Sequence, residues 1–173
     1  MCAILDANVV YTVFGSRSST ECPQIGLQLL DWLNSGKGRL VTGGKAKEEL
    51  YYNGNFQRWV RQKSRAGGRI VVYEEKMSRK EMLSALVVEY GDTEIEAEIR
   101  WIKKQKLPKK MKPKSNDLHV IALARISGAR LLYSDDKKLR KDFKNKHLVN
   151  SPRGKVYSKE DHQHLLDQNL CRQ

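Results

Sequence analysis

The residues in this sequence that are best suited to catalysis are acids at the ends of apolar segments. Asp6 closes the run AILD, and Glu49 lies in KEELYY, shortly after the apolar run RLVTG. Asp117 opens a nearly uncharged segment, and Asp135 and Asp136 follow the end of that segment. Carboxylates that come close together raise one another's pKa, and a divalent cation relieves the repulsion. Because Mg²⁺ and Mn²⁺ prefer oxygen ligands, these acids are candidate ligands for such an ion.

Most of these acids also have an ordinary structural explanation. Asp117 suits the first turn of a helix, where its charge meets the positive end of the helix dipole. Asp135 or Asp136 could be the N-cap of the helix KKLRKDF. Glu49 could be a solvated acid among neighbouring lysines. Asp6 is harder to explain in this way, because an acid inside AILDANVV is expected to be at least half buried, which is costly without a partner.

The elements that must position these acids alternate between strands and helices. Short continuous apolar runs predict buried strands, and apolar residues at helical spacing predict helices. The expected strands are 3–8, 39–43, 69–74, 130–134 and 147–150. The expected helices are 23–36, 45–52, 54–64, 78–91, 94–106, 115–128, 137–143 and a capped helix that begins at Ser158.

This alternation predicts one α/β domain, a three-layer sandwich with a central, mostly parallel sheet. A basic loop insertion at 103–114 is expected within it. Residues 1–150 are expected to form the main domain, with 151–173 as a C-terminal extension packed on that same domain. Ligands of parallel sheets bind outside the carboxyl ends of the strands. The acids are therefore expected to meet at that edge of the sheet.

The charge of the chain indicates a polyanionic partner. The 173 residues include 33 Lys and Arg against 20 Asp and Glu, a formal net charge of +13. A nucleic acid is the first candidate partner and an acidic protein the second, although a solubilising surface excess would give the same balance. No apolar run approaches the roughly 20 residues of a membrane span, and no signal peptide is expected. Three scattered cysteines (Cys2, Cys22 and Cys171) predict reduced thiols in a cytoplasmic protein.

The segments AILDANVV, KEEL and NDLHVIALARISGARLLYSDDKKL resemble, in that order, the motifs of the PIN-domain nucleases. The family pattern is a strand ending in Asp-x-Asn, a Glu-Leu on a mid-chain helix, an Asp opening a helix of small apolar residues, and a strand followed by Ser or Thr, any residue and Asp. The matching positions are Asp6, Asn8, Glu49, Asp117, Ser134 and Asp136, with Asp135 as the reserve for the last acid. Two positions depart from the pattern. Ala7 replaces a common hydroxyl residue, and Lys138 stands where many relatives have a further acid, which puts a second metal ion in doubt.

The resemblance implies a PIN-like fold and metal-dependent hydrolysis of phosphodiester bonds in RNA, with Mg²⁺ or Mn²⁺ as the cofactor. The catalytic residues and metal ligands would be Asp6, Glu49, Asp117 and Asp136. Asn8 and Ser134 would orient those acids. A small nuclease of this kind resembles the ribonuclease toxins of toxin–antitoxin pairs, whose partner is an acidic antitoxin-like protein; a homo-oligomer is also open. The alternatives are a housekeeping or defence nuclease, and a catalytically degenerate basic module that binds RNA or a protein partner.

The lysine-rich segment KKQKLPKKMKPK, residues 103–114, leads directly to Asp117. Its two prolines prevent a continuous helix, and its lysines repel one another, so we expect a flexible arm that holds RNA beside the acids. A solvated loop is the alternative. The candidate RNA-binding residues are Lys103, Lys104, Lys106, Lys109, Lys110, Lys112 and Lys114. His119 is expected to be structural, because helical spacing from Asp117 would point it away from the acids.

Overall fold

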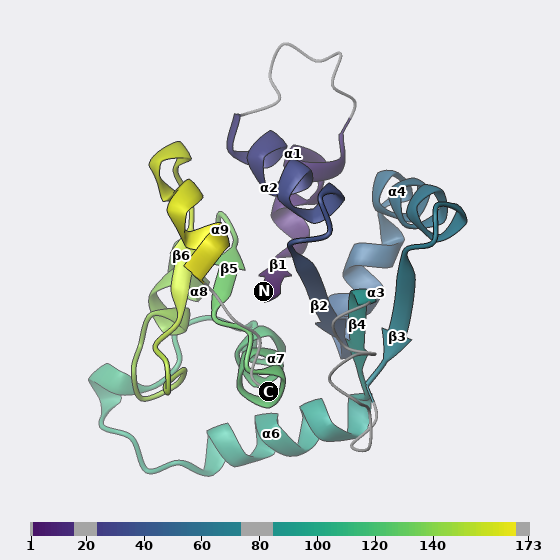
Figure 1. The fold of residues 1–173 in the computed structure, drawn as a ribbon. Helices are drawn as coiled ribbons and strands as arrows, with labels where there is room; N and C mark the ends of the chain where they lie inside the picture. The colour runs from purple at the N-terminus through teal and green to yellow at the C-terminus, as the bar shows by residue number, and fades with distance from the viewer. Residues whose placement is uncertain (1, 16–23, 74–84, 169–173) are drawn as a thin grey trace.

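A central sheet of six strands organises the computed structural model, which describes residues 2–15, 24–73 and 85–168 (Figure 1). The strand order is β3-β4-β2-β1-β5-β6, and every neighbouring pair is parallel. The strands are β1 (Cys2–Leu5), β2 (Arg39–Gly43), β3 (Arg69–Val72), β4 (Ala85–Tyr90), β5 (Leu131–Tyr133) and β6 (Lys155–Tyr157). The predicted α/β class with a parallel central sheet is therefore confirmed.

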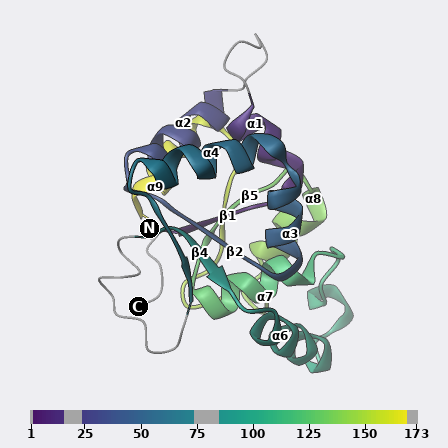
Figure 2. The same cartoon turned by 90° about the vertical axis from the view of Figure 1, so that its right-hand side faces the viewer.

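Helices cover both faces of this sheet. The α-helices are α1 (Val10–Phe14), α2 (Gln24–Asn34), α3 (Gly44–Tyr52), α4 (Gly54–Arg65), α6 (Asp92–Lys104), α7 (Leu118–Ser127), α8 (Lys137–Phe143) and α9 (His164–Gln168). Three short 3₁₀ helices are η1 (Ala7–Val9), η2 (Lys109–Met111) and η3 (Glu160–Gln163). In Figure 2, α1, α2 and α4 lie on one side of the strands, and α6 and α7 lie on the other.

Two hydrophobic cores follow from the alternation of side chains along each strand. Ala3 and Leu5 of β1 pack with α1, α2 and α4 in one core. Ile4, between them, packs with α6, α7 and α8 in the other core. The strands β1, β2, β4 and β5 are buried on both faces, which is why they appear in the sequence as continuous apolar runs, whereas β3 at the edge of the sheet is largely exposed.

The helix predicted over residues 78–91 is wrong in its second half. Ala85–Tyr90 form β4, which lies between β3 and β2, while residues 78–84 lie outside the described part of the chain. The run ALVVEY is buried almost throughout, as a central strand requires, and periodicity cannot distinguish such a run from a buried helix. Gly91 does not close a helix there; it is the N-cap of α6.

The strand predicted at 147–150 is also wrong. These residues form turns, and the sixth strand is β6, whose Val156 pairs with Leu132 of β5. Leu148 and Val149 are nevertheless buried in the second core, and this burial produces the apolar signal. A strand of the central sheet thus lies in the segment after residue 150.

The expectation of reduced cysteines fails at Cys2, which forms a disulfide. The cysteine argument for a cytoplasmic location is thereby removed, and that location stays a prediction.

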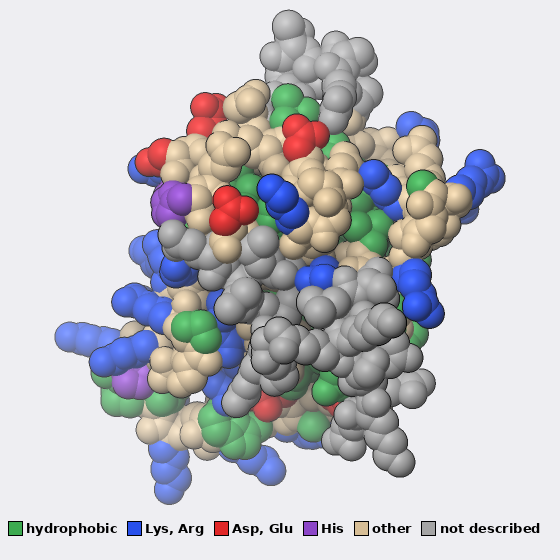
Figure 3. All heavy atoms as spheres, in the orientation of Figure 1, with side chains coloured by type: hydrophobic (Ala, Val, Ile, Leu, Met, Phe, Trp, Pro, Cys, Tyr) green, Lys and Arg blue, Asp and Glu red, His purple; other side chains and the backbone are tan. Residues whose placement is uncertain are grey.

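The surface carries the basic excess unevenly. Figure 3 shows Lys and Arg side chains gathered along the left and lower left of the molecule, on the side where Figure 1 places α8 and the chain that follows α6. Among the helices described, none is long and apolar enough to cross a membrane.

The packing of β6 can be tested at Tyr157. Its side chain is 0% exposed, its ring meets that of Tyr133 edge to face at 5.9 Å, and its hydroxyl donates a hydrogen bond to Gln28 Oε1 at 2.6 Å. We expect Tyr157→Ala to lower the free energy of unfolding by about 3 kcal/mol or more, because it leaves a cavity between β6 and α2. The matched control is Tyr52→Ala, at a side chain 94% exposed, with an expected change within about 0.5 kcal/mol. Urea denaturation measures both, and equal effects would show that β6 is not part of the folded core.

Candidate active site at the carboxyl edge of the sheet

The pairing of β1 with β5 brings Asp6 and Ser134 together. Leu5 and Tyr133 are in register at the carboxyl ends of these parallel strands, so the residues that follow them are neighbours. The Asp6 backbone N–H continues the ladder by donating to the Tyr133 carbonyl at 3.0 Å. The Ser134 hydroxyl then donates to Asp6 Oδ2 at 2.5 Å, across 128 residues of sequence.

Ser134 and Asn8 also hold the turn that follows β5. The Ser134 hydroxyl oxygen accepts a hydrogen bond from the Asp136 backbone N–H at 3.0 Å, and Asn8 Oδ1 accepts one from the Asp135 backbone N–H at 3.3 Å. Ser134 is fully buried. Both residues thus fix the geometry of the edge at which Asp6 lies.

Asp117 enters this region from the N-terminus of α7. It is the N-cap residue, with φ −91° and ψ 50°, outside the helical conformation. The Ser115 hydroxyl donates to Asp117 Oδ2 at 2.9 Å and accepts from the Asp117 backbone N–H at 3.0 Å. These two hydrogen bonds fix the Asp117 carboxylate relative to its own backbone.

Glu49 comes from α3 and is half-buried, with 32% of its side chain exposed. Its Oε1 lies 3.3 Å from Lys45 Nζ one helical turn earlier, and its Oε2 faces His119 of α7 at 3.8 Å. Glu49 is therefore placed between a solvated cation and a buried imidazole.

The pKa of Asp6 shows that three of the acids interact. Burial is the largest effect and raises the pKa of Asp6, while the hydrogen bond from Ser134 opposes this rise. The negative charges of Asp117 and Glu49 raise it further. The structure thus places Asp6, Glu49 and Asp117 within electrostatic reach of one another at the carboxyl edge of the sheet.

His119 is a member of this site that the sequence prediction missed. The side chain is 7% exposed, and its Nε2 atom, which faces Glu49, has no hydrogen-bond partner within the described structure. Burial lowers the pKa of His119, against the opposing charges of Glu49 and Asp117. The prediction that His119 points away from the acids is wrong because Asp117 is a non-helical N-cap, so helical spacing does not apply between the two. An N-cap assignment for Asp117 would have revealed this.

Asp136 has a structural role that the sequence left open. Its Oδ1 accepts hydrogen bonds from the backbone N–H groups of Lys138 and Leu139, which makes it the N-cap of α8. It joins the other acids through the bond from its own N–H to Ser134. Asp135, the reserve ligand, is exposed.

Within residues 2–15, 24–73 and 85–168, no group of three or more His, Cys, Asp and Glu side chains is arranged so that it could hold a metal ion. Binding a metal ion at the acids therefore requires their side chains to move together. Two features fit such a site nonetheless. The negative charges of Asp117 and Glu49 raise the pKa of Asp6, and the buried Nε2 of His119 has no hydrogen-bond partner among the described residues.

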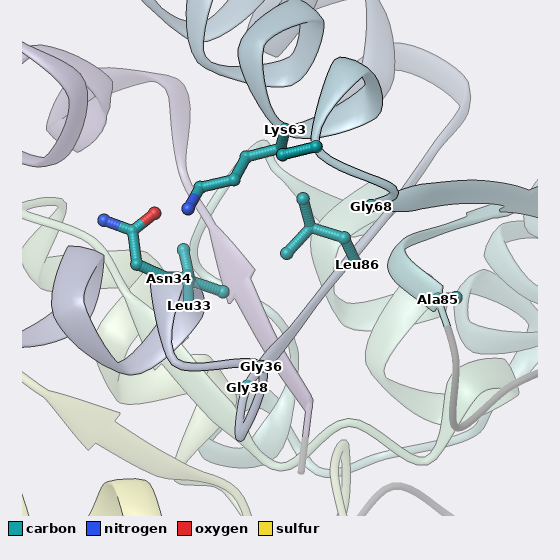
Figure 4. A pocket seen from close by; sticks show the side chains of 9 residues that line it. Leu33, Asn34, Gly36, Gly38, Lys63, Gly68, Ala85 and Leu86 are labelled. Atoms are coloured by element: carbon teal, nitrogen blue, oxygen red, sulfur yellow. The ribbon is translucent and has the colours of Figure 1, made fainter.

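A separate hollow lies at the opposite edge of the sheet. It has a volume of about 220 Å³ and is lined by residues just before β2 and at the start of β4, including Gly38, Ala85 and Leu86. Figure 4 shows Lys63 of α4 extending toward Asn34 of α2 across this hollow. It brings no cluster of acids together, so the carboxyl edge remains the candidate active site.

No protein-family model, curated protein or solved structure matches this chain. The resemblance to the PIN-domain nucleases therefore stays a prediction that rests on the motifs themselves.

The raised pKa of Asp6 predicts the behaviour of Asp6→Asn. An acid with a raised pKa in the folded state adds stability below its ordinary pKa of 3.8, and this contribution is lost as the pH rises through the folded-state value. Asparagine carries no charge, and its oxygen can still accept the bond from Ser134. We expect Asp6→Asn to be as stable as the wild type or more stable at pH 7, with an advantage that shrinks toward pH 4.

Urea denaturation at the two pH values measures this. Asp161→Asn, at a side chain 77% exposed, is the control and should change the free energy of unfolding by less than about 0.5 kcal/mol. A loss of stability in Asp6→Asn at pH 7 would show instead that the charged carboxylate is a structural requirement.

Proposed function

We propose that this protein is a metal-dependent endoribonuclease that hydrolyses phosphodiester bonds in RNA at the carboxyl edge of its sheet, with Mg²⁺ or Mn²⁺ as the cofactor. The observation that supports this most directly is the buried Nε2 of His119, which has no hydrogen-bond partner among the described residues and lies 3.8 Å from Glu49, in a cluster where Asp6 and Asp117 repel each other. Uncompensated polar and charged groups are costly to keep in a fold and are common at functional sites.

Asp6, Glu49 and Asp117 would hold the cation, and His119 would lie beside them with its Nε2 facing Glu49. When bound, a divalent cation lowers the pKa of a water molecule and offsets the negative charge of a phosphodiester. Ser134 would keep the Asp6 carboxylate oriented through the hydrogen bond that it already donates. Asp136 would help to position Ser134, to which its N–H donates, and would fix the start of α8. Asn8 would fix the turn after β5 by accepting from the Asp135 N–H.

The PIN-like fold, the cytoplasmic location and a biological role as the toxin of a toxin–antitoxin pair belong to the same proposal. They rest on the motif order and on the charge of +13, which suits both RNA and an acidic antitoxin-like protein. Housekeeping or defence nucleases would use the same chemistry.

A catalytically degenerate RNA-binding module is the second candidate. It is favoured by the Asp136 carboxylate, which caps α8, and by the lack of a ready metal-holding group among the described residues. The basic surface would serve such a module equally well, so only an assay of cleavage separates the two.

The proposal predicts cleavage of end-labelled single-stranded RNA by the purified protein in Mn²⁺, and none in a chelator. Asp6→Asn and Asp117→Asn are each expected to lower the cleavage rate at least about 100-fold, because each removes a charged ligand. Glu96→Gln is the matched control, since its side chain is 69% exposed on α6, and it should retain full activity.

Circular dichroism checks that the variants remain folded. RNA that is retained but not cut in Mg²⁺ or Mn²⁺ would favour the degenerate module. Cleavage that survives both Asp→Asn substitutions would place the chemistry elsewhere.

A further inference from the structure

A hollow of about 450 Å³ on the surface is lined mostly by Lys and Arg side chains. One wall is the chain around η2, which contributes Lys110, Lys112 and Lys114. The other wall is the end of α8 and the turns after it, which contribute Lys141, Lys144, Lys146 and Arg153. We call this feature the basic hollow. The sequence indicates only the first wall, and the predicted RNA-binding residues Lys103, Lys104, Lys106 and Lys109 do not line the basic hollow.

The described residues leave most of the positive charge of the basic hollow uncompensated. Seven basic side chains line it against the single carboxylate of Asp142, which leaves six positive charges. In the described part of the chain, none of the seven forms an ion pair with an acid. Cations that repel one another in a concave surface focus a positive potential, which attracts an anion.

The walls of the basic hollow are tied to each other. Asp142, 3% exposed, accepts hydrogen bonds through Oδ2 from the backbone N–H groups of Lys114 and Ser115, both at 2.7 Å. Asn145 donates to the Met111 carbonyl at 3.0 Å. The second half of the lysine-rich segment is thus fixed against α8, whereas sequence analysis predicted a flexible arm. The lysines are therefore presented from a fixed backbone.

The same contacts connect the basic hollow to the acids. Ser115, held by Asp142, donates its hydroxyl to Asp117. At the other end of α8, the Asp136 N–H reaches Ser134, which bonds to Asp6. Since α8 has seven residues, the acids and the basic hollow lie about one helix length apart, on the order of 10 Å.

We infer that the basic hollow binds the phosphate backbone of single-stranded RNA whose neighbouring nucleotides reach the acids. The assignment of RNA as the occupant rests on the proposed function. Among the described residues, Met111 is the only apolar side chain in the lining, so the hollow lacks the apolar anchors of a protein interface. The described lining holds no Phe, Tyr or Trp, and its one ring is that of His147, so the hollow would contact mainly phosphates and bind with little regard to sequence.

The test uses the wall that the sequence did not reveal. In the triple variant Lys141→Gln, Lys144→Gln and Lys146→Gln, all three side chains are exposed, so the fold should be retained. The control is Arg58→Gln, Arg61→Gln and Arg65→Gln, which removes the same charge from exposed positions on α4. Helix α4 packs on the opposite face of the sheet from α8. Fluorescence anisotropy with a labelled single-stranded RNA in a chelator measures binding without cleavage.

The triple variant of Lys141, Lys144 and Lys146 should lower the steepness of the plot of log affinity against log salt, so that its slope becomes less negative by about 2. Each lost phosphate contact on a single strand contributes about 0.7 to that slope. This change of slope corresponds to about 100-fold weaker binding near 0.1 M salt if the affinities converge at 1 M. The α4 control should keep the wild-type slope. Equal losses of RNA affinity in the two triple variants, or no loss in the variant of Lys141, Lys144 and Lys146, would contradict binding at the basic hollow. Either result would indicate a diffuse effect of net charge.

Three further outcomes separate the components of the inference. Polyglutamate that displaces the RNA at equal charge concentration would overturn the assignment to a nucleic acid. The expected change of slope in a protein that does not cut RNA in Mn²⁺ would support the basic hollow and contradict the proposed function. Cleavage of RNA by the protein, together with an unchanged slope in the triple variant, would support the proposed function and contradict binding at the basic hollow.

Discussion

The parallel pairing of β1 with β5 is the contact on which the candidate site depends. It fixes Leu5 opposite Tyr133, so that Asp6 and Ser134, 128 residues apart in sequence, emerge side by side. A shift of one residue would turn Asp6 to the other face of the sheet, because side chains alternate along a strand. The two cores prevent such a shift, since Ile4 and Leu5 belong to different ones.

The charges are arranged in two connected regions. Acids meet at the carboxyl edge of the sheet, where burial and mutual repulsion raise the pKa of Asp6. Unneutralised lysines gather one helix away, where Asp142 and Asn145 hold two segments together. An acidic centre repels a polyanion on its own, and a fixed cationic surface beside it offsets that repulsion. The short segment from Lys114 to Asp117 belongs to both regions and makes them one arrangement.

The sequence was sufficient to predict the parallel α/β class and the strands that become β1, β2, β3 and β5, because each is a continuous apolar run bounded by polar or turn residues. The strand expected at 3–8 nevertheless ends at Leu5, because Ala7–Val9 form η1. It was not sufficient for β4, since a run such as ALVVEY fits a buried strand and a buried helix equally well. Leu148 and Val149 gave the signal of a strand because they are buried in turns.

Within the candidate site, the sequence motifs indicated Asp6, Asn8, Glu49, Asp117 and Ser134, which lie at the carboxyl edge of the sheet. Contacts across the fold decided the capping role of Asp136 and the position of His119. The direction of the His119 side chain follows from the non-helical conformation of Asp117, which composition does not reveal. The second wall of the basic hollow comes from residues 141–153, whose approach to the lysine-rich segment depends on the buried contacts of Asp142.

The claim that the acids form a metal site is tested most directly by calorimetric titration of Mn²⁺ into the purified protein and into a folded Asp117→Asn variant. We expect saturable binding to the wild-type protein, and an affinity at least about 10-fold lower in the variant, because a charged oxygen ligand is lost. Equal affinities in the two proteins, or no binding to either, would contradict a metal site at the carboxyl edge of the sheet.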